Sequence, residues 1–495
     1  MKNYIYRPNF FLSSAFAGIL LSLFLFASNT AIAVTGALNE QQIRKLFNKA
    51  VKISGTVGAQ LSIIKDGQQL DFTYGLANAE LNIPMTQDTI IQIGSTTKIF
   101  NAMVVMTLVE EGLLNLDTPI IKYIPEFKVA DPLATQTVTL RQLLSMSSGL
   151  DNGDYAEHGP GDDALAKYVA SLKTLPQHFP PGSAFGYSNA GTDIAGYVAQ
   201  RVTGLYWDDL LMERILKPAG LKNAVTRARD RVYQRISVGH TVDPQSGDPS
   251  VIRPWSISRG HGPAGSTLSI SAHDLARFGK LFLNEGVADT GKQILSKEGI
   301  QTMMTPQIDL PMHFYANAWG IGPSRNEWEG VTLWGHGGSN LSGRSYLHWI
   351  PEKNAVIAFM VNTPAARDRF MKVMFKEVTK VAFGISKPNI DKPSQPLTIP
   401  NPERYVGTYE QVNGICVIEA VGNRLIKRII YNQKEVDQVA LIPLGGDRFL
   451  IDRGEKADPL TMLEDTAFFG RDKKGRATNM LNVVFPLSRK TDGGL

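Results

Sequence analysis

The sequence predicts a mixed α/β fold with an antiparallel sheet, followed by a small all-β domain. Residues 58–77, "GAQLSIIKDGQQLDFTYGLA", form two alternating runs around Asp66-Gly67, a pattern typical of a β-hairpin. Residues 343–362, "GRSYLHWIPEKNAVIAFMVN", again indicate two strands, around a Pro-Glu-Lys-Asn turn. Helical and loop-rich sequence separates these two strand pairs. We therefore expect both ends of the first 385 residues to pair in one antiparallel sheet.

The remaining elements fit this arrangement. Amphipathic helices are predicted at residues 41–52 and 365–383, and a largely buried helix at 98–112. The proline-rich stretch "SKPNIDKPSQPLTIPNPERY" is typical of an extended linker. Short β-rich runs follow it, namely "CVIEAV", "RIIYN" and "MLNVVF". The predicted parts are a signal peptide, a first domain, a linker and an all-β domain, at residues 1–33, 34–385, 386–401 and 402–495.

Composition excludes several classes of function. The chain has 495 residues, of which 43% are apolar and 20% charged, as in an ordinary globular protein. The formal charge of +5 is spread along the chain without a basic run carrying interleaved aromatics, so we expect no nucleic-acid partner. No His, Cys and Asp cluster has metal-ligand spacing, so neither a metal nor another cofactor is expected. Cys416 is the single cysteine, which rules out a disulfide within the chain.

The N-terminus has the pattern of a secretory signal peptide. Lys2 and Arg7 precede an apolar run at residues 10–27, and Ala31-Ile32-Ala33 supplies a small-x-small cleavage site. We expect cleavage after Ala33 and a periplasmic or secreted protein; the alternative is an uncleaved membrane anchor. No second run of about 18 apolar residues occurs, so we expect no membrane association after cleavage.

A serine and a lysine three residues apart are candidate catalytic groups. Ser95 follows an apolar run at a strand-to-helix junction, and Lys98 lies one helical turn later. On a helix, residues i and i+3 share a face, so the amine can reach the hydroxyl. Ser62 and Lys65 have the same spacing, but in a strand they point to opposite faces. Alone, the pattern is more often a helix-capping serine beside an extended lysine.

Two further motifs strengthen the catalytic interpretation. Tyr187-Ser188-Asn189 stands directly before an amphipathic helix, whereas Tyr315-Ala316-Asn317 has no such helix after it. His336-Gly337-Gly338-Ser339 opens the second strand region, and its glycines allow backbone amides to approach a ligand closely. A lone buried histidine or tyrosine is usually a core residue; the joint order of the three motifs favours a site.

This joint order resembles the serine β-lactamase and penicillin-binding superfamily, in the branch of class C β-lactamases, D-aminopeptidases and related esterases. The resemblance covers about residues 40–385. "VTLRQLLSMSSGL" at 138–150 matches a further family block, although Met146 replaces its usual histidine. The resemblance implies an antiparallel sheet flanked by helices with an all-helical subdomain across a cleft. It also implies a lipocalin-like C-terminal domain, as some peptidases of this type carry.

The resemblance also assigns roles to the motif residues. Ser95 would form the acyl-enzyme, Lys98 would help to deprotonate it, and Tyr187 would relay protons to the leaving group. Asn189 would bind the substrate amide, and the backbone N–H groups of Ser95 and Ser339 would form the oxyanion hole. His336 and Gly338 complete the expected substrate-binding set.

His336 separates this chain from class C β-lactamases, which place a lysine there to hold the substrate carboxylate. Histidine is mostly neutral near pH 7. Arg344 could replace that charge only if the chain bends, because along a straight strand it lies about 26 Å away. We therefore expect a D-aminopeptidase-like peptidase acting on a short peptide or other small molecule. The alternatives are a carboxylesterase or β-lactamase using the same residues, and a non-catalytic penicillin-binding-like protein. The sequence is also compatible with a homo-oligomer.

Overall fold

The computed structural model describes residues 38–254, 258–311, 315–389, 397–431, 434–452 and 466–490. The predicted signal peptide lies outside these residues, as does part of the predicted linker. Among the described residues, no helix has both the length and the apolar character needed to cross a bilayer. Within the same residues, no group of three or more His, Cys, Asp or Glu side chains is arranged to hold a metal ion.

Both ends of the first part of the chain meet in one antiparallel sheet, as predicted. β1 pairs with β14, with Ala59 opposite Val361 and Lys65 opposite Ala355. The nine strands lie in the order β3-β2-β1-β14-β13-β12-β11-β10-β9. Their bounds are β1 Gly58–Lys65, β2 Gln68–Asn78, β3 Ile83–Pro84, β9 Ile308–Asp309, β10 Ala318–Trp319, β11 Ser324–Trp328, β12 Val331–Asn340, β13 Gly343–Ile350 and β14 Ala355–Val361.

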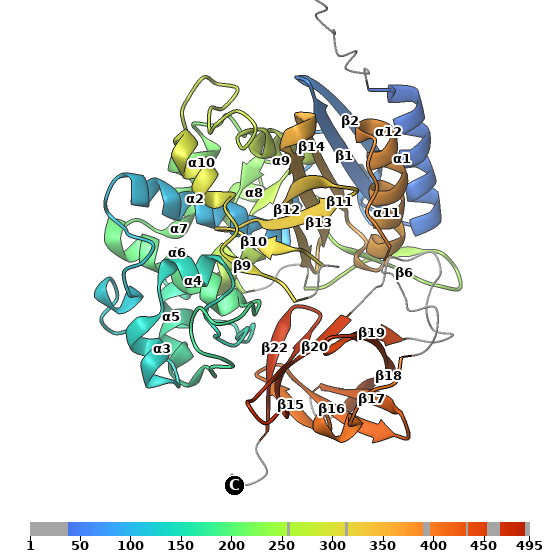
Figure 1. The fold of residues 1–495 in the computed structure, drawn as a ribbon. Coiled ribbons are helices and arrows are strands. Elements are labelled where there is room, and N and C mark those ends of the chain that lie inside the picture. The colour runs from blue at the N-terminus through green and yellow to red at the C-terminus, as the bar shows by residue number, and fades with distance from the viewer. Residues whose placement is uncertain are drawn as a thin grey trace, which may run out of the picture. The chain divides into compact units, whose positions relative to one another are not determined.

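Helices cover both faces of this sheet. On one face, α1 (Glu40–Ser54) packs beside α11 (Arg367–Val373) and α12 (Thr379–Phe383), as Figure 1 shows. A π-helical segment at Met374–Val378 joins α11 to α12. α9 (Ala272–Lys280) packs against the opposite face. The amphipathic patterns at residues 41–52 and 365–383 thus bury their apolar stripes on one side of the sheet, where they form one core.

A region of mostly short helices lies between the two strand pairs. Its central helix, α2 (Thr97–Glu110), is buried from Thr97 to Leu108, so both its apolar and its polar sides lie in the interior. α6 (Asn189–Thr203) packs against α2 and begins at an N-cap, Ser188. The other helices are α3 Pro132–Thr137, α4 Leu140–Leu144, α5 Ala164–Ser171, α7 Trp207–Leu211, α8 Ala228–Arg231 and α10 Lys297–Met303.

Two small sheets support the helical region. The first has the strand order β4-β8-β5 and leads directly into the turn before α2, while the second pairs β6 with β7. Their bounds are β4 Ile91–Gln92, β5 Ala224–Val225, β6 His240–Val242, β7 Pro249–Val251 and β8 Ser269–Ile270.

The predicted all-β domain is a closed barrel of eight strands, β15 to β22, in which each strand pairs with the next and β22 pairs with β15. Tyr405, Tyr409, Phe449 and Phe469 pack together in its core. The bounds are β15 Gly407–Gln411, β16 Gly414–Val421, β17 Arg424–Tyr431, β18 Lys434–Gly445, β19 Arg448–Asp452, β20 Thr466–Arg471, β21 Ala477–Asn482 and β22 Phe485–Arg489.

One of the predicted β-rich runs is divided between two strands of the barrel. "MLNVVF" is not a single strand, because β21 ends at Asn482 and β22 begins at Phe485. Val483 and Val484 form the turn between them, and Val483 takes a left-handed backbone conformation, with φ of 61°. The turn itself consists of two β-branched valines, and only Asn482 before it is a residue typical of turns, so the sequence pattern did not mark the reversal.

Candidate active site

Ser95 and Lys98 meet at the start of α2. A 3-10 turn at Gly94–Thr96 precedes the helix, and Lys98 lies in its first turn. Lys98 Nζ donates a hydrogen bond to Ser95 Oγ over 3.1 Å. Lys98 is buried, whereas Ser95 is half-buried and lines a cavity of about 370 Å³. The structure therefore gives the serine access to a ligand and keeps the lysine away from solvent.

Gly94 brings the serine turn against β12. Its φ is 54°, and a Cβ at this position would lie 2.6 Å from the backbone nitrogen of Ser339. Gly338 is equally constrained, because a Cβ there would lie 1.7 Å from the carbonyl oxygen of Ile93. Only glycine fits these two close approaches. They hold the backbone of Ser339 beside Ser95, where the two predicted oxyanion donors are located.

The Lys98 amine has two other partners, both in the interior. Nζ donates to Asn189 Oδ1 over 2.6 Å and to the Ala264 carbonyl oxygen over 2.7 Å. Burial lowers the pKa of Lys98 to about 7, and the nearby charge of Asp193 opposes that shift. Loss of hydration penalises the ammonium form, so the amine titrates within the physiological pH range.

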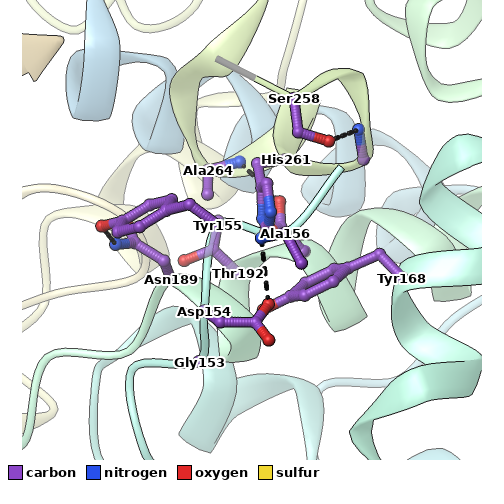
Figure 2. A network of polar contacts seen from close by, with 12 residues as sticks. Gly153, Asp154, Tyr155, Ala156, Tyr168, Asn189, Thr192, Ser258, His261 and Ala264 are labelled. Carbon is purple, nitrogen blue, oxygen red and sulfur yellow. Dashed lines mark hydrogen bonds and ion pairs between the residues drawn. The ribbon is translucent and has the colours of Figure 1, made fainter. Parts of the chain in front are cut away.

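A buried Asp–His pair holds the Ala264 carbonyl in place. The Ala264 N–H donates to Asp193 Oδ1 over 2.9 Å, and Asp193 Oδ2 lies 3.0 Å from His261 Nδ1. Figure 2 shows His261 beside Ala264, with the rings of Tyr155 and Tyr168 near it; their centroids lie 5.5 and 4.1 Å from that of the imidazole. Asp193 thus fixes one hydrogen-bond acceptor of Lys98 and places a negative charge near it.

Tyr187 lies directly before α6, and its ring centroid is 5.0 Å from Lys98 Nζ. Burial raises the pKa of Tyr187 well above its usual value, and a hydrogen bond with Ser95 partly offsets this. The hydroxyl therefore keeps its proton at neutral pH. Met146 packs in the same apolar cluster, and the Ser188 N–H points at its sulfur over 3.5 Å.

His336 is buried and lines the cavity beside Tyr187 and Trp319, with ring centroids 6.0 and 5.2 Å away. Its Nδ1 bonds to the carbonyl oxygen of Gly337, which assigns the proton to Nδ1 and leaves Nε2 as an acceptor. No side chain or backbone group in the described residues bonds to Nε2. Burial and the charge of Lys98 lower the pKa of His336 to about 3, so the ring is uncharged.

Arg344 does come close to the His336 motif, because β12 and β13 form a hairpin that places Arg344 opposite Ser339. The distance of about 26 Å assumed one straight strand, and the hairpin turn between β12 and β13 removes that assumption. However, the guanidinium donates to the carbonyl oxygens of Asn340 and Gly343 and so braces the hairpin turn. It is bound to the backbone rather than directed at the cavity.

All the predicted site residues come together. Lys98 lies behind the cavity, and the other six line it: Ser95, Tyr187, Asn189, His336, Gly338 and Ser339. Residues that sequence reasoning missed also line it. Tyr155 Oη accepts a hydrogen bond from Asn189 Nδ2 over 2.7 Å, as Figure 2 shows, and comes from a polar loop without a motif.

Further cavity residues were also missed, among them Tyr315 and the turn of the barrel. Tyr315, whose motif has no helix after it and which was therefore not expected at the site, lines the cavity, and its ring is stacked with that of Trp319, with centroids 6.3 Å apart. The turn of the barrel at Val483–Phe485 also lines the cavity. Its contribution depends on packing between residues far apart in the sequence, which leaves no local signal.

Comparisons with known proteins agree with this geometry. The family profile named Beta-lactamase matches residues 43–375. "Penicillin-binding protein 4" of Amycolatopsis lactamdurans is 32% identical over 362 residues, covering 72% of this chain and 94% of the relative.

Two solved proteins share the fold. The crystal structure of SurE has a TM-score of 0.76 at 22% identity and covers 91% of this chain and 99% of its own; SurE is also solved with D-Leu. The D-amino acid amidase of Ochrobactrum anthropi SV3 has a TM-score of 0.54 at 24% identity, covering 65% of this chain and 91% of its own. The family profile and the penicillin-binding relative together place this chain in the serine β-lactamase and penicillin-binding protein family.

Proposed function

We propose that the protein is a serine hydrolase that cleaves amide bonds through an acyl-enzyme on Ser95. The observation that carries the proposal is the set of partners around Lys98 Nζ. A neutral amine has two N–H groups and one lone pair. Asn189 Oδ1 and the Ala264 carbonyl can only accept, so they take the two N–H groups. The lone pair of the neutral amine is then left for the Ser95 hydroxyl, 3.1 Å away, which donates to it as a general base requires; the ammonium form donates in the opposite direction.

The proposed reaction assigns one proton path. Lys98 takes the proton of Ser95 Oγ while Oγ attacks the substrate carbonyl, and the carbonyl oxygen gains negative charge next to the Ser95 and Ser339 N–H groups. Tyr187 gives its hydroxyl proton to the departing nitrogen and regains one from Lys98. Water then attacks the acyl-enzyme and restores Ser95. The raised pKa of Tyr187 supports its role as a proton carrier that starts protonated.

His336 favours substrates without a carboxylate near Ser95. An uncharged ring provides no positive charge to pair with a carboxylate, and its Nε2 is buried without a hydrogen-bond partner among the described residues. This supports an aminopeptidase-like or amidase-like activity over efficient β-lactam turnover. The names of two proteins with this fold, a D-amino acid amidase and a SurE bound to D-Leu, support a D-configured acyl group.

The proposed setting is the periplasm or the exterior of the cell, after removal of residues 1–33, with a short peptide or similar small molecule as substrate. N-terminal sequencing of the protein recovered outside the cytoplasm tests this. A chain that begins at Val34 supports the proposal, and a chain that retains its first residues overturns it.

The activity test compares kcat/KM for a D-alanine nitroanilide, a short-chain nitrophenyl ester and a chromogenic cephalosporin, with Ser95→Ala as the blank. We expect the nitroanilide to lead. Turnover of the ester alone would replace the peptidase with a carboxylesterase. A lead by the cephalosporin would contradict the role given to His336. A wild type no more active than the blank would identify a non-catalytic binding protein.

A further inference from the structure

The turn between β21 and β22 of the barrel forms part of the cavity that contains Ser95. Val483, Val484 and Phe485 line that cavity. The Tyr187 N–H donates to the carbonyl oxygen of Val484 over 3.0 Å. The ring of Phe485 packs edge-on against the ring of Tyr187, with centroids 5.5 Å apart. The barrel thus contacts the backbone and the side chain of the residue proposed to carry the proton.

The sequence of this turn suits a buried surface and not an exposed hairpin. A two-residue turn usually uses Asn-Gly or Asp-Gly, because its residues take positive φ. Val483 is β-branched and still has a φ of 61°, which is a costly conformation. Val484 is only 5% exposed and packs with Phe185 and Trp319. The packing of this turn against apolar side chains of the first domain explains why it is apolar and why its strained backbone is retained.

A second group of contacts ties the barrel to the loop that carries Tyr155. Asp151 Oδ2 lies 2.9 Å from His178 Nε2 and accepts the Val412 N–H over 3.1 Å. His178 Nδ1 lies 2.8 Å from Ser488 Oγ. Asn413 Nδ2 donates to the Gly153 carbonyl oxygen over 2.5 Å. Asp151 and His178 are both buried, so these polar contacts are shielded from water.

From these contacts we propose that Val484 and Phe485 form the wall that limits the size of the leaving group. The proposal rests on the proposed function, because there Tyr187 hands its proton to the departing nitrogen, and these two side chains lie beside Tyr187. A compact amine fits against the wall, while a bulky aromatic amine such as nitroaniline meets the Phe485 ring and leaves more slowly than a compact one, although the nitroanilide is still cleaved faster than the ester and the cephalosporin. The barrel then acts as a specificity element of the first domain's site.

The test holds the acyl group constant and varies the leaving group. kcat/KM is measured for D-alaninamide and for D-alanine nitroanilide in wild type, Phe485→Ala and Val484→Ala. Val436→Ala is the control for Val484→Ala, since Val436 belongs to the same barrel and is 58% exposed. Because each variant is compared with wild type on both substrates, intrinsic differences in leaving-group reactivity cancel.

We expect Phe485→Ala to raise the nitroanilide-to-amide ratio by about tenfold, since apolar pockets discriminate by roughly 10- to 200-fold per group removed. Val484→Ala should raise it severalfold, and it retains the backbone bond to Tyr187, so it stays informative if Phe485→Ala does not fold. Val436→Ala should leave the ratio unchanged. A uniform loss of rate on both substrates would show a purely structural wall and overturn the proposal. An inactive wild type would instead overturn the proposed function and this inference together.

Discussion

Two Ser-x-x-Lys segments in this chain have the same spacing and different surroundings. Ser62 and Lys65 lie in β1, where Ser62 is buried and its Oγ accepts a hydrogen bond from Gln69 Nε2 over 2.9 Å. Ser95 and Lys98 lie at the turn into α2, where the amine bonds to the hydroxyl and is enclosed by α6 and the loop around Ala264. Alternation in the strand separates the first pair, and the helix joins the second.

The comparison shows what changes a motif into a site. Spacing supplies only the opportunity for contact. Burial of Lys98 lowers its pKa, and two acceptors orient its lone pair toward Ser95. The predictions below test that difference, and each uses the β1 pair as a matched control where one exists.

The largest effect is expected at the nucleophile. Ser95→Ala should lower kcat by about 10⁴-fold or more, as removal of the nucleophile does in other acyl-enzyme hydrolases. Ser62→Ala should change kcat/KM by less than about threefold, since Ser62 is buried in β1 and does not line the cavity, so it makes no contact with the transition state. The measurement is steady-state kinetics on the preferred substrate. Comparable losses in the two variants would show that the comparison between the pairs is wrong.

The next effect concerns the base. Lys98→Met should lower kcat by about 10²- to 10⁴-fold, the usual contribution of a positioned general base. Lys65→Met should stay close to wild type in the same assay. Full activity in Lys98→Met would show that Lys98 is not the base and would leave Tyr187 as the candidate for that role.

A pH profile tests the titration of Lys98 directly. Because the pKa of Lys98 is lowered to about 7 and the base must be unprotonated, kcat/KM should rise with pH and level off above about 7. Asp193 opposes that lowering, while Tyr187 and His336, which also face the amine, stay uncharged at this pH. Asp193→Asn should therefore move the rise to lower pH, by on the order of one unit. A profile whose rise lies near pH 10 would contradict the account.

Stability should show the same titration with a smaller effect. The folded pKa of Lys98 is about 7 and the unfolded value is 10.5, so the unfolded chain binds more protons between these values. Wild-type stability should therefore rise with pH across this window relative to Lys98→Met, by several kcal/mol at most, at about 1.4 kcal/mol per unit. Urea unfolding of both proteins at pH 6, 7, 8 and 9 measures the difference. A pH-independent difference would mean that the amine titrates normally.

The sequence predicted most of the first domain because its signals are local. The hairpin at Asp66-Gly67, the strand pair at the Pro-Glu-Lys-Asn turn and the amphipathic helices were all confirmed. The all-β character of the second domain was also predicted, but its closure into a barrel depends on pairing between β15 and β22, which no local pattern shows.

The site was predictable only where a motif marks it. Ser95, Tyr187 and His336 each stand beside a structural cue, and the structure brings them together. Tyr155 has no motif, and Phe485 enters through the packing of one domain on another. Long-range packing of this kind depends on shape rather than on residue order, so it became visible only in the folded chain.

The central claim is that Ser95, and not Ser62, is the activated nucleophile. Labelling with an alkyl fluorophosphonate tests it most directly, with intact-mass and peptide mass spectrometry of wild type, Ser62→Ala and Ser95→Ala. The account predicts one phosphonyl group on the peptide that contains Ser95 in wild type and in Ser62→Ala, and none in Ser95→Ala. Modification at Ser62, or equal modification of Ser95→Ala, would contradict it.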